Sequence, residues 1–159
     1  MRRYLGAAVV TAAVAAGWIA MLPPASLRQP IAFPHAKHPS TGCTVCHSGG
    51  ETAIHAGIPD VATCTKCHAT APPGTSAAWE AALSRKTIGW VQVTHVPDDV
   101  LFSHRRHTTI GGLQCVSCHG DMVQRVRPPG RSPVLLNMTT CLSCHRREGA
   151  DEDCAACHR

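Results

Sequence analysis

The sequence predicts a small domain of short helices and irregular loops wrapped around covalently bound groups, preceded by one apolar N-terminal helix. Three observations lead to this fold class. The pattern Cys-x-x-Cys-His occurs five times and accounts for all ten cysteines. With three Trp, two Phe and one Tyr in 159 residues, side chains alone would form only a thin core, and such chains need additional staples. One long apolar run also opens the sequence.

The repeated motif is the attachment signal for c-type haem. Its two thiols add to the two vinyl groups of one haem, and the histidine that follows is held where its imidazole can bind the iron. Five motifs therefore predict five haem c groups. The predicted covalent attachment residues are Cys43, Cys46, Cys64, Cys67, Cys115, Cys118, Cys141, Cys144, Cys154 and Cys157. The predicted proximal iron ligands are His47, His68, His119, His145 and His158.

Zinc sites and disulfides also use Cys-x-x-Cys pairs. Neither gives a reason for a histidine directly after every second cysteine, and only eleven histidines are present in the chain. We therefore favour haem over both alternatives. The apolar macrocycles would then form most of the core, and we expect the chain not to fold without them.

Six histidines remain for the sixth coordination position, one more than five haems require. Four of them lie in a repeated element, because Phe33-x-His35-x-x-His38 matches Phe102-x-His104-x-x-His107. Two histidines three residues apart cannot easily bind the same iron, so each element is expected to serve two neighbouring haems. The predicted distal ligands are His35, His38, His95, His104 and His107, with His55 as a possible further ligand.

Coordination decides between electron transfer and catalysis. Methionine is the rival sixth ligand and would raise the reduction potential, with Met122 and Met138 as the candidates. Because six histidines are available, we expect five bis-histidine, low-spin haems. Iron with two imidazole ligands has no open position for a substrate. The sequence therefore predicts an electron carrier without catalytic residues rather than an enzyme.

The repeat also divides the chain into segments. A first module would carry two haems and a second module three, with a haem-free spacer between them. The predicted segments are an anchor helix at residues 1–22, a linker at 23–30, the first module at 31–69, the spacer at 70–94 and the second module at 95–159.

The spacer has the composition of a short helix followed by an extended stretch. Thr75 or Ser76 could cap a helix over residues 77–86, in which Trp79 and Leu83 lie on one face because they are four residues apart. We interpret this spacer as a cover over haem edges rather than as a catalytic element.

The N-terminal run from Tyr4 to Leu22 follows two arginines. As a helix it would span about 28 Å, close to the thickness of a bilayer's hydrocarbon core. A cleaved signal peptide is the alternative, but the proline at position 23 makes a poor cleavage site. We expect a retained anchor in the bacterial cytoplasmic membrane, with Arg2 and Arg3 cytoplasmic and the haem domain in the periplasm.

The formal net charge of the chain is +5. Five haems would bring up to about ten propionate charges, so the holoprotein need not be basic. The basic sequence therefore gives no reason to expect a nucleic-acid partner. Clusters such as Arg125, Arg127 and Arg131 are more often solvated surfaces or propionate partners than dedicated docking sites.

The Phe-x-His-x-x-His element ahead of a Cys-x-x-Cys-His motif resembles the class III multihaem cytochrome c family. Within that family, residues 31–158 look most like the pentahaem subunit of alternative complex III. The segments that carry this resemblance are His55 to Pro59, Trp90, His95 to His107, Cys118 to Met122 and Met138 to Arg146.

The resemblance implies that His35 and His104 serve the haems of the next motifs, at Cys43–Cys46 and Cys115–Cys118, while His38 and His107 reach other haems. It also implies iron–sulfur and quinol-oxidising membrane subunits as partners, with electrons passing to a periplasmic cytochrome c or terminal oxidase. The alternatives are a multihaem reductase of a nitrogen or sulfur compound and a free periplasmic electron shuttle. The Arg- and Pro-rich loop from Val123 to Leu136 departs from the resemblance.

The fifth motif, Cys154 to His158, has no counterpart in the first module. We expect its haem to take a distal histidine from far upstream and to tie the end of the chain back onto the earlier module.

Overall fold

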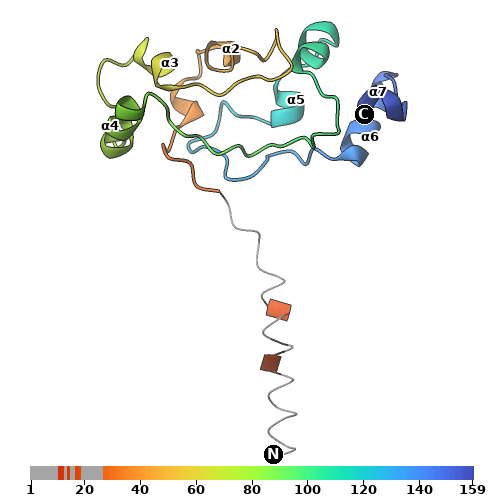
Figure 1. Ribbon diagram of the computed structural model, residues 1–159, viewed down its shortest axis with the longest axis horizontal. Coiled ribbons are helices and arrows are strands. Elements are labelled where there is room, and N and C mark those ends of the chain that lie inside the picture. Colours follow the sequence, from red (N-terminus) through yellow and green to blue (C-terminus); the bar gives the residue numbers. More distant parts are fainter. Residues whose placement is uncertain (1–10, 13, 15–16, 19–26) are drawn as a thin grey trace, which may run out of the picture.

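The computed structural model describes residues 11–12, 14, 17–18 and 27–159 (Figure 1). Most of the predicted anchor at residues 1–22 therefore lies outside the described residues, and so does the first half of the predicted linker, residues 23–26. Among the residues that are described, no helix has the length and the apolar character needed to cross a membrane.

Short helical segments joined by loops make up the described domain, as predicted, and residues 27–159 contain no β-strand. A single isolated antiparallel bridge joins Val100 and His158. The segments are the 3-10 helix η1 (His35–Lys37), α2 (Cys43–Cys46), α3 (Val61–Thr65), α4 (Ser76–Arg85), the π-helix η2 (Arg106–Ile110), α5 (Val116–His119), α6 (Met138–Glu148) and α7 (Cys154–Cys157).

The protein core is as thin as the composition predicts and lies beside α4. Phe33 and Cys64 pack against it, so this small core supports the first Phe-x-His-x-x-His element and the second motif. The buried hydrophobic residues of the described chain are Ile31, Val61, Trp79, Ala82 and Ile88.

Helix α4 matches the helix predicted in the spacer to within one residue at each end. It stops at Lys86, which adopts a left-handed conformation with φ of 56° and donates its backbone N–H to the carbonyls of Ala82 and Leu83. The predicted buried face is wrong in one position. Ala82 is 1% exposed and packs with Trp79, whereas Leu83 is 40% exposed. The helix therefore packs through the residue three positions after Trp79 rather than four.

Three loop segments far apart in the sequence lie together at the base of the domain. The side chain of Gln29 exchanges two hydrogen bonds with the backbone of Val91, at 2.8 and 2.9 Å. The backbone N–H of Ala36 donates to the Arg125 carbonyl at 2.9 Å, and that of Leu27 donates to Gly130 at 2.7 Å. The chain that enters the domain is thereby fastened to the Arg- and Pro-rich loop.

The loop after the first motif is bound to the second Phe-x-His-x-x-His element. The backbone N–H groups of His104 and Arg105 donate to the carbonyls of Ile54 and Ala53, at 3.1 and 3.0 Å, and the Thr108 hydroxyl donates to the Gly50 carbonyl at 2.8 Å. A Cβ atom at Gly49 would lie 2.0 Å from the His55 carbonyl oxygen, so this loop can close only around glycine. These contacts hold the loop after the first motif against the second repeated element.

The C-terminal motif is hydrogen bonded to the start of the predicted second module. Leu101 donates its backbone N–H to the Cys157 carbonyl at 2.7 Å, and Arg159 donates to the Asp99 carbonyl at 3.1 Å. Among the described residues, the backbone partner of the chain's end is therefore the segment 98–101.

Replacing Trp79 by alanine should destabilise the holoprotein by about 3–5 kcal/mol, because it removes the largest buried side chain of a small core. Leu83→Ala on the same helix is the control, and should cost about 1 kcal/mol or less because Leu83 is 40% exposed. Chemical unfolding followed by circular dichroism measures both. Equal losses in the two variants would contradict the packing described here.

Candidate functional site

Each Cys-x-x-Cys-His motif forms one turn of helix. In four of the five, the backbone N–H of the histidine donates to the carbonyl of the first cysteine, at 2.8 Å for His47 and His158 and 3.0 Å for His68 and His119. The remaining motif, which contains His145, lies inside the longer helix α6. Residues three and four apart share one side of a helix. This turn therefore presents two thiols and one imidazole in the same direction.

All ten thiols are free in the structure, and each motif has one exposed and one half-buried cysteine. Within the described residues, no three His, Cys, Asp or Glu side chains converge as a bare metal site. The cysteine pairs thus do not gather into the tetrahedral clusters that structural zinc would need. Each pair remains separately available for a covalent attachment of its own.

Polar side chains begin three of these helices. Asp60 accepts from the Thr63 N–H at 3.1 Å, Asn137 accepts from the Thr140 N–H at 2.9 Å, and Asp153 accepts from the Ala155 N–H at 2.8 Å. Such caps satisfy backbone donors that a short helix leaves unpaired. They set where α3, α6 and α7 start, and so where the cysteines of those motifs point.

Three motif histidines face a histidine from a Phe-x-His-x-x-His element. The ring centroids lie 6.1 Å apart for His38 and His68. They lie 6.3 Å apart for His104 and His119, whose planes differ by 5°, and 6.2 Å apart for His107 and His145.

This spacing fits an iron atom between the two rings. With a metal–nitrogen bond of about 2.0 Å and about 1.2 Å from Nε2 to the ring centre, two imidazoles on opposite sides of one metal have centroids about 6.4 Å apart. Rings in direct contact would lie closer, as Phe33 and His38 do at 4.7 Å. The residues present therefore fit the haem that the motifs imply.

In most of these histidines, Nδ1, the ring nitrogen that would point away from a metal bound at Nε2, is hydrogen bonded. The Nδ1 atoms of His47 and His104 lie 2.9 Å from the carbonyls of Gly57 and Ile54, and that of His107 lies 2.9 Å from the Ser103 carbonyl. A carbonyl partner keeps the proton on Nδ1 and leaves Nε2 free for a metal. These backbone contacts thus prepare the rings as ligands.

His35 is the exception among the repeated histidines. Its Nδ1 atom is buried without a hydrogen-bond partner among the described residues. Burial lowers the pKa of His35, and the neighbouring His47 and His38 imidazoles lower it further. Half-burial beside the histidine of the first motif therefore favours the neutral form of this imidazole, which is the form that binds a metal.

Neighbouring thiols show how the motifs follow one another in space. Burial raises the pKa of Cys46, and the adjacent Cys67 thiol raises it further. In the same order of causes, burial and then Cys43 raise the pKa of Cys115.

The other two junctions are of the same kind. After burial, Cys144 and then Cys141 raise the pKa of Cys118, and Cys157 raises that of Cys141. Each motif thus lies beside the next one in an unbranched row. The order is α3, α2, α5, α6 and α7, and Figure 1 shows these helices from one side of the domain to the other.

The structure does not bring the two remaining predicted distal histidines to a motif histidine. His55 and His95 are both exposed, and neither side chain makes a ring contact or a hydrogen bond within the described residues. Of the rival methionines, Met138 is 61% exposed.

Sequence reasoning missed Asp99. Its Oδ2 atom lies 3.2 Å from Nδ1 of His158, across 59 residues of sequence. An aspartate in a Pro-Asp-Asp turn carries no local signal of such a role, and only the return of the chain's end to residues 98–101 reveals it.

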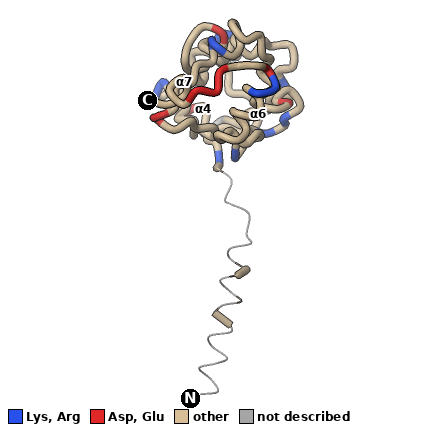
Figure 2. Tube along the Cα trace, turned by 90° about the vertical axis from the view of Figure 1, so that its right-hand side faces the viewer, with Lys and Arg blue, Asp and Glu red and all other residues tan. Residues whose placement is uncertain are grey.

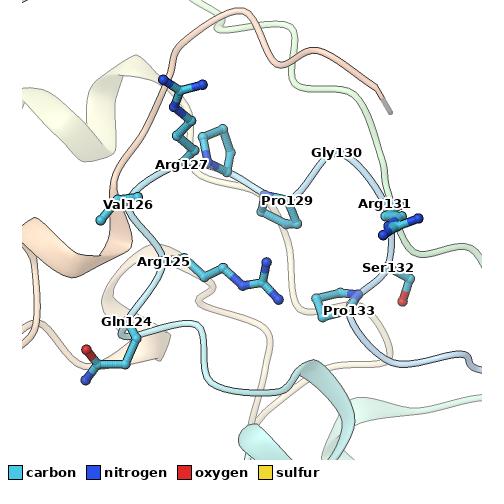
Figure 3. A pocket seen from close by; sticks show the side chains of 10 residues that line it. Gln124, Arg125, Val126, Arg127, Pro129, Gly130, Arg131, Ser132 and Pro133 are labelled. Carbon is cyan, nitrogen blue, oxygen red and sulfur yellow. The ribbon is translucent and has the colours of Figure 1, made fainter. Parts of the chain in front are cut away.

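The Arg- and Pro-rich loop surrounds a hollow of about 490 Å³ lined by residues 124–133. Figure 3 shows the Arg125 side chain pointing across this loop toward Pro133. Within the described residues, Arg125, Arg127 and Arg131 form no ion pair with a carboxylate. Their guanidinium groups are therefore available to anionic partners such as propionates.

The acidic residues gather elsewhere, around the last two motifs. Arg146 forms an ion pair of 2.7 Å with Glu152, and Figure 2 shows the acidic run after α6 beside the basic end of that helix. Both partners of this pair are exposed, so it contributes little to stability.

Comparison with known proteins indicates a multihaem cytochrome c. Residues 19–93 match the family model described as the class III cytochrome c family, and residues 100–159 match that of cytochrome c7 and related cytochromes c. The multihaem cytochrome c subunit of menaquinone reductase from Nitratidesulfovibrio vulgaris (strain Hildenborough) is 29% identical over 161 residues, covering 82% of this chain and 77% of the relative. Each family match includes one Phe-x-His-x-x-His element and the motifs that follow it, so both segments of the chain are similar to class III multihaem cytochromes c.

Proposed function

We propose that this chain is the electron-transfer subunit of a membrane complex that acts on a quinone, and that it carries five covalently attached haems. The observation that carries the proposal is the set of three imidazole pairs at 6.1–6.3 Å, each joining a motif histidine to a repeated element. Bound haem supplies reversible one-electron oxidation and reduction of its iron.

The ring pairs suggest which histidines share an iron. We assign His38 with His68, His104 with His119, and His107 with His145. His35 pairs with His47, supported by its buried, partnerless Nδ1 and by the adjacent His47 imidazole. Each repeated element then serves the motif that follows it and the one after, which extends the pattern expected from the family resemblance.

For the fifth site we keep His95 as the distal ligand of the iron bound by His158, with His55 as the alternative. The support is proximity along the chain, because His95 lies three residues before Asp98, whose carbonyl accepts from the Arg159 guanidinium at 2.9 Å. The ten cysteines of the five motifs provide the covalent links.

The row of motifs supports a relay. The attachment sites follow one another in the order Cys64–Cys67, Cys43–Cys46, Cys115–Cys118, Cys141–Cys144 and Cys154–Cys157. Each Phe-x-His-x-x-His element binds across one junction, and the hydrogen bonds between residues 50–54 and residues 104–108 hold the junction between the two elements. Electrons can thus enter at one end of the row and leave at the other.

Placement and partners follow from the sequence. The apolar N-terminal run would anchor the chain in the cytoplasmic membrane with the haem domain in the periplasm, beside iron–sulfur and quinone-active membrane subunits. The resemblance to alternative complex III favours electron flow from quinol to a periplasmic cytochrome c or oxidase. The relative's name, menaquinone reductase, favours the reverse direction.

Purification of the tagged chain from solubilised membranes tests this role. We expect iron–sulfur and integral membrane subunits to co-purify, and a menaquinol analogue to exchange electrons with the haems only in that complex. A reduced periplasmic cytochrome, added separately, establishes the direction. Recovery of the chain alone from the soluble fraction would instead indicate a free shuttle, and binding of nitrite or sulfite to a high-spin haem would indicate a reductase.

His104→Ala should convert one haem from low-spin to high-spin, because it removes the ligand opposite His119. About one fifth of the low-spin electron paramagnetic resonance signal should be lost if five haems are bound. The matched control is Arg105→Ala, since Arg105 is the exposed neighbour of His104 and its side chain makes no hydrogen bond or ion pair within the described residues. An unchanged spectrum for His104→Ala would contradict the assigned pair.

A further inference from the structure

His158 differs from the other histidines whose Nδ1 atom has a hydrogen-bond partner. Within the described residues, the Nδ1 atoms of five paired or motif histidines lie against backbone carbonyls, those of Pro34, Gly57, Ile54, Ser103 and Asp151. The Nδ1 atom of His158 instead lies 3.2 Å from a carboxylate oxygen, Oδ2 of Asp99.

The backbone holds Asp99 in this position. Its carbonyl accepts the Arg159 backbone N–H at 3.1 Å, while Leu101 donates to Cys157 at 2.7 Å. The bridge between Val100 and His158 lies between these two bonds. Backbone hydrogen bonds on both sides of the bridge therefore support the contact between the exposed Asp99 side chain and His158.

No cation in the described residues neutralises this carboxylate. The Arg159 guanidinium donates to the backbone carbonyl of Asp98 at 2.9 and 3.2 Å. Within the described residues, the only ion-pair partner of Asp99 is His158 itself. The negative charge thus acts on the imidazole.

A carboxylate on the outer nitrogen makes an imidazole a more basic ligand than a carbonyl does. A more basic, more negative ligand stabilises ferric iron relative to ferrous iron, so it lowers the reduction potential. The exposure of Asp99, at 63%, weakens the effect through solvent screening but does not change its sign.

We propose that Asp99 is a positioning residue for His158 that lowers the reduction potential of the C-terminal haem site below the value that a backbone carbonyl partner would give. This inference rests on the proposed function, in which His158 binds the iron at one end of the row. It sets that end of the relay apart from the four sites whose histidines come from repeated elements or face them.

The test compares Asp99→Asn with Asp98→Asn in the purified, full-length holoprotein. Asparagine keeps the size of the side chain and an acceptor oxygen but removes the charge. Asp98 is the matched control, because it is the adjacent aspartate and its carboxylate makes no hydrogen bond or ion pair within the described residues. Potentiometric titration followed by haem absorbance gives the midpoint potentials, and mass spectrometry counts the attached haems.

We expect one midpoint potential to rise in Asp99→Asn and none to change in Asp98→Asn. Asp99→Glu, which keeps the charge, should return that potential toward the wild-type value. If Asp99→Asn fails to retain its fifth haem, Asp99→Ser provides the second neutral variant, with the same upward shift expected.

Two results would overturn the inference while leaving the proposed function intact. One is an unchanged set of potentials in the neutral variants with five haems attached, and the other is an equal shift in both Asp98 and Asp99 variants, which would indicate general surface charge. A wild-type protein without haem at Cys154 and Cys157 would instead overturn the proposed function, and the haem count distinguishes this case from the other two.

Discussion

The structure depends on one geometric constraint, which is that imidazoles from distant parts of the chain are held in pairs at a spacing that fits one metal atom. His104 and His119 meet it at 6.3 Å with nearly parallel rings. A backbone carbonyl behind several of these rings, including that of His104, holds Nδ1, so that the ring can turn its other nitrogen to a metal. Irregular loops supply two of these carbonyls, those of Gly57 and Ile54.

This constraint explains why so little of the chain forms a conventional core. Five buried hydrophobic side chains, all near α4, support only the end of the domain that holds the second motif. The rest is organised by short helical turns and loop hydrogen bonds around ten thiols, one exposed and one half-buried in each motif. A chain of this size without further apolar mass would be marginal. Bound macrocycles can supply that mass, which links the electron carrier's cofactor to its stability.

The repeated Phe-x-His-x-x-His element connects neighbouring Cys-x-x-Cys-His motifs. Its two histidines lie beside the histidines of two different motifs, so each element links two neighbouring sites. The loop of residues 50–54, which follows the first motif, is hydrogen bonded to the second element. The row does not follow sequence order, because the first motif lies between the second and the third. The C-terminal motif stands outside this arrangement, with Asp99 as its support.

Sequence alone predicted the attachment sites and the proximal histidines, because these depend on spacings of three and four residues within one turn of helix, and it predicted the loop-rich fold that the structure confirms. It also located the repeated histidines. Only the tertiary structure decided which histidines face each other, the order of the motifs, the burial of Ala82 instead of Leu83, and the return of the chain's end to residues 98–101. Those features depend on contacts between segments far apart in the sequence, such as His158 with Asp99, and no local pattern encodes where loops of this kind cross.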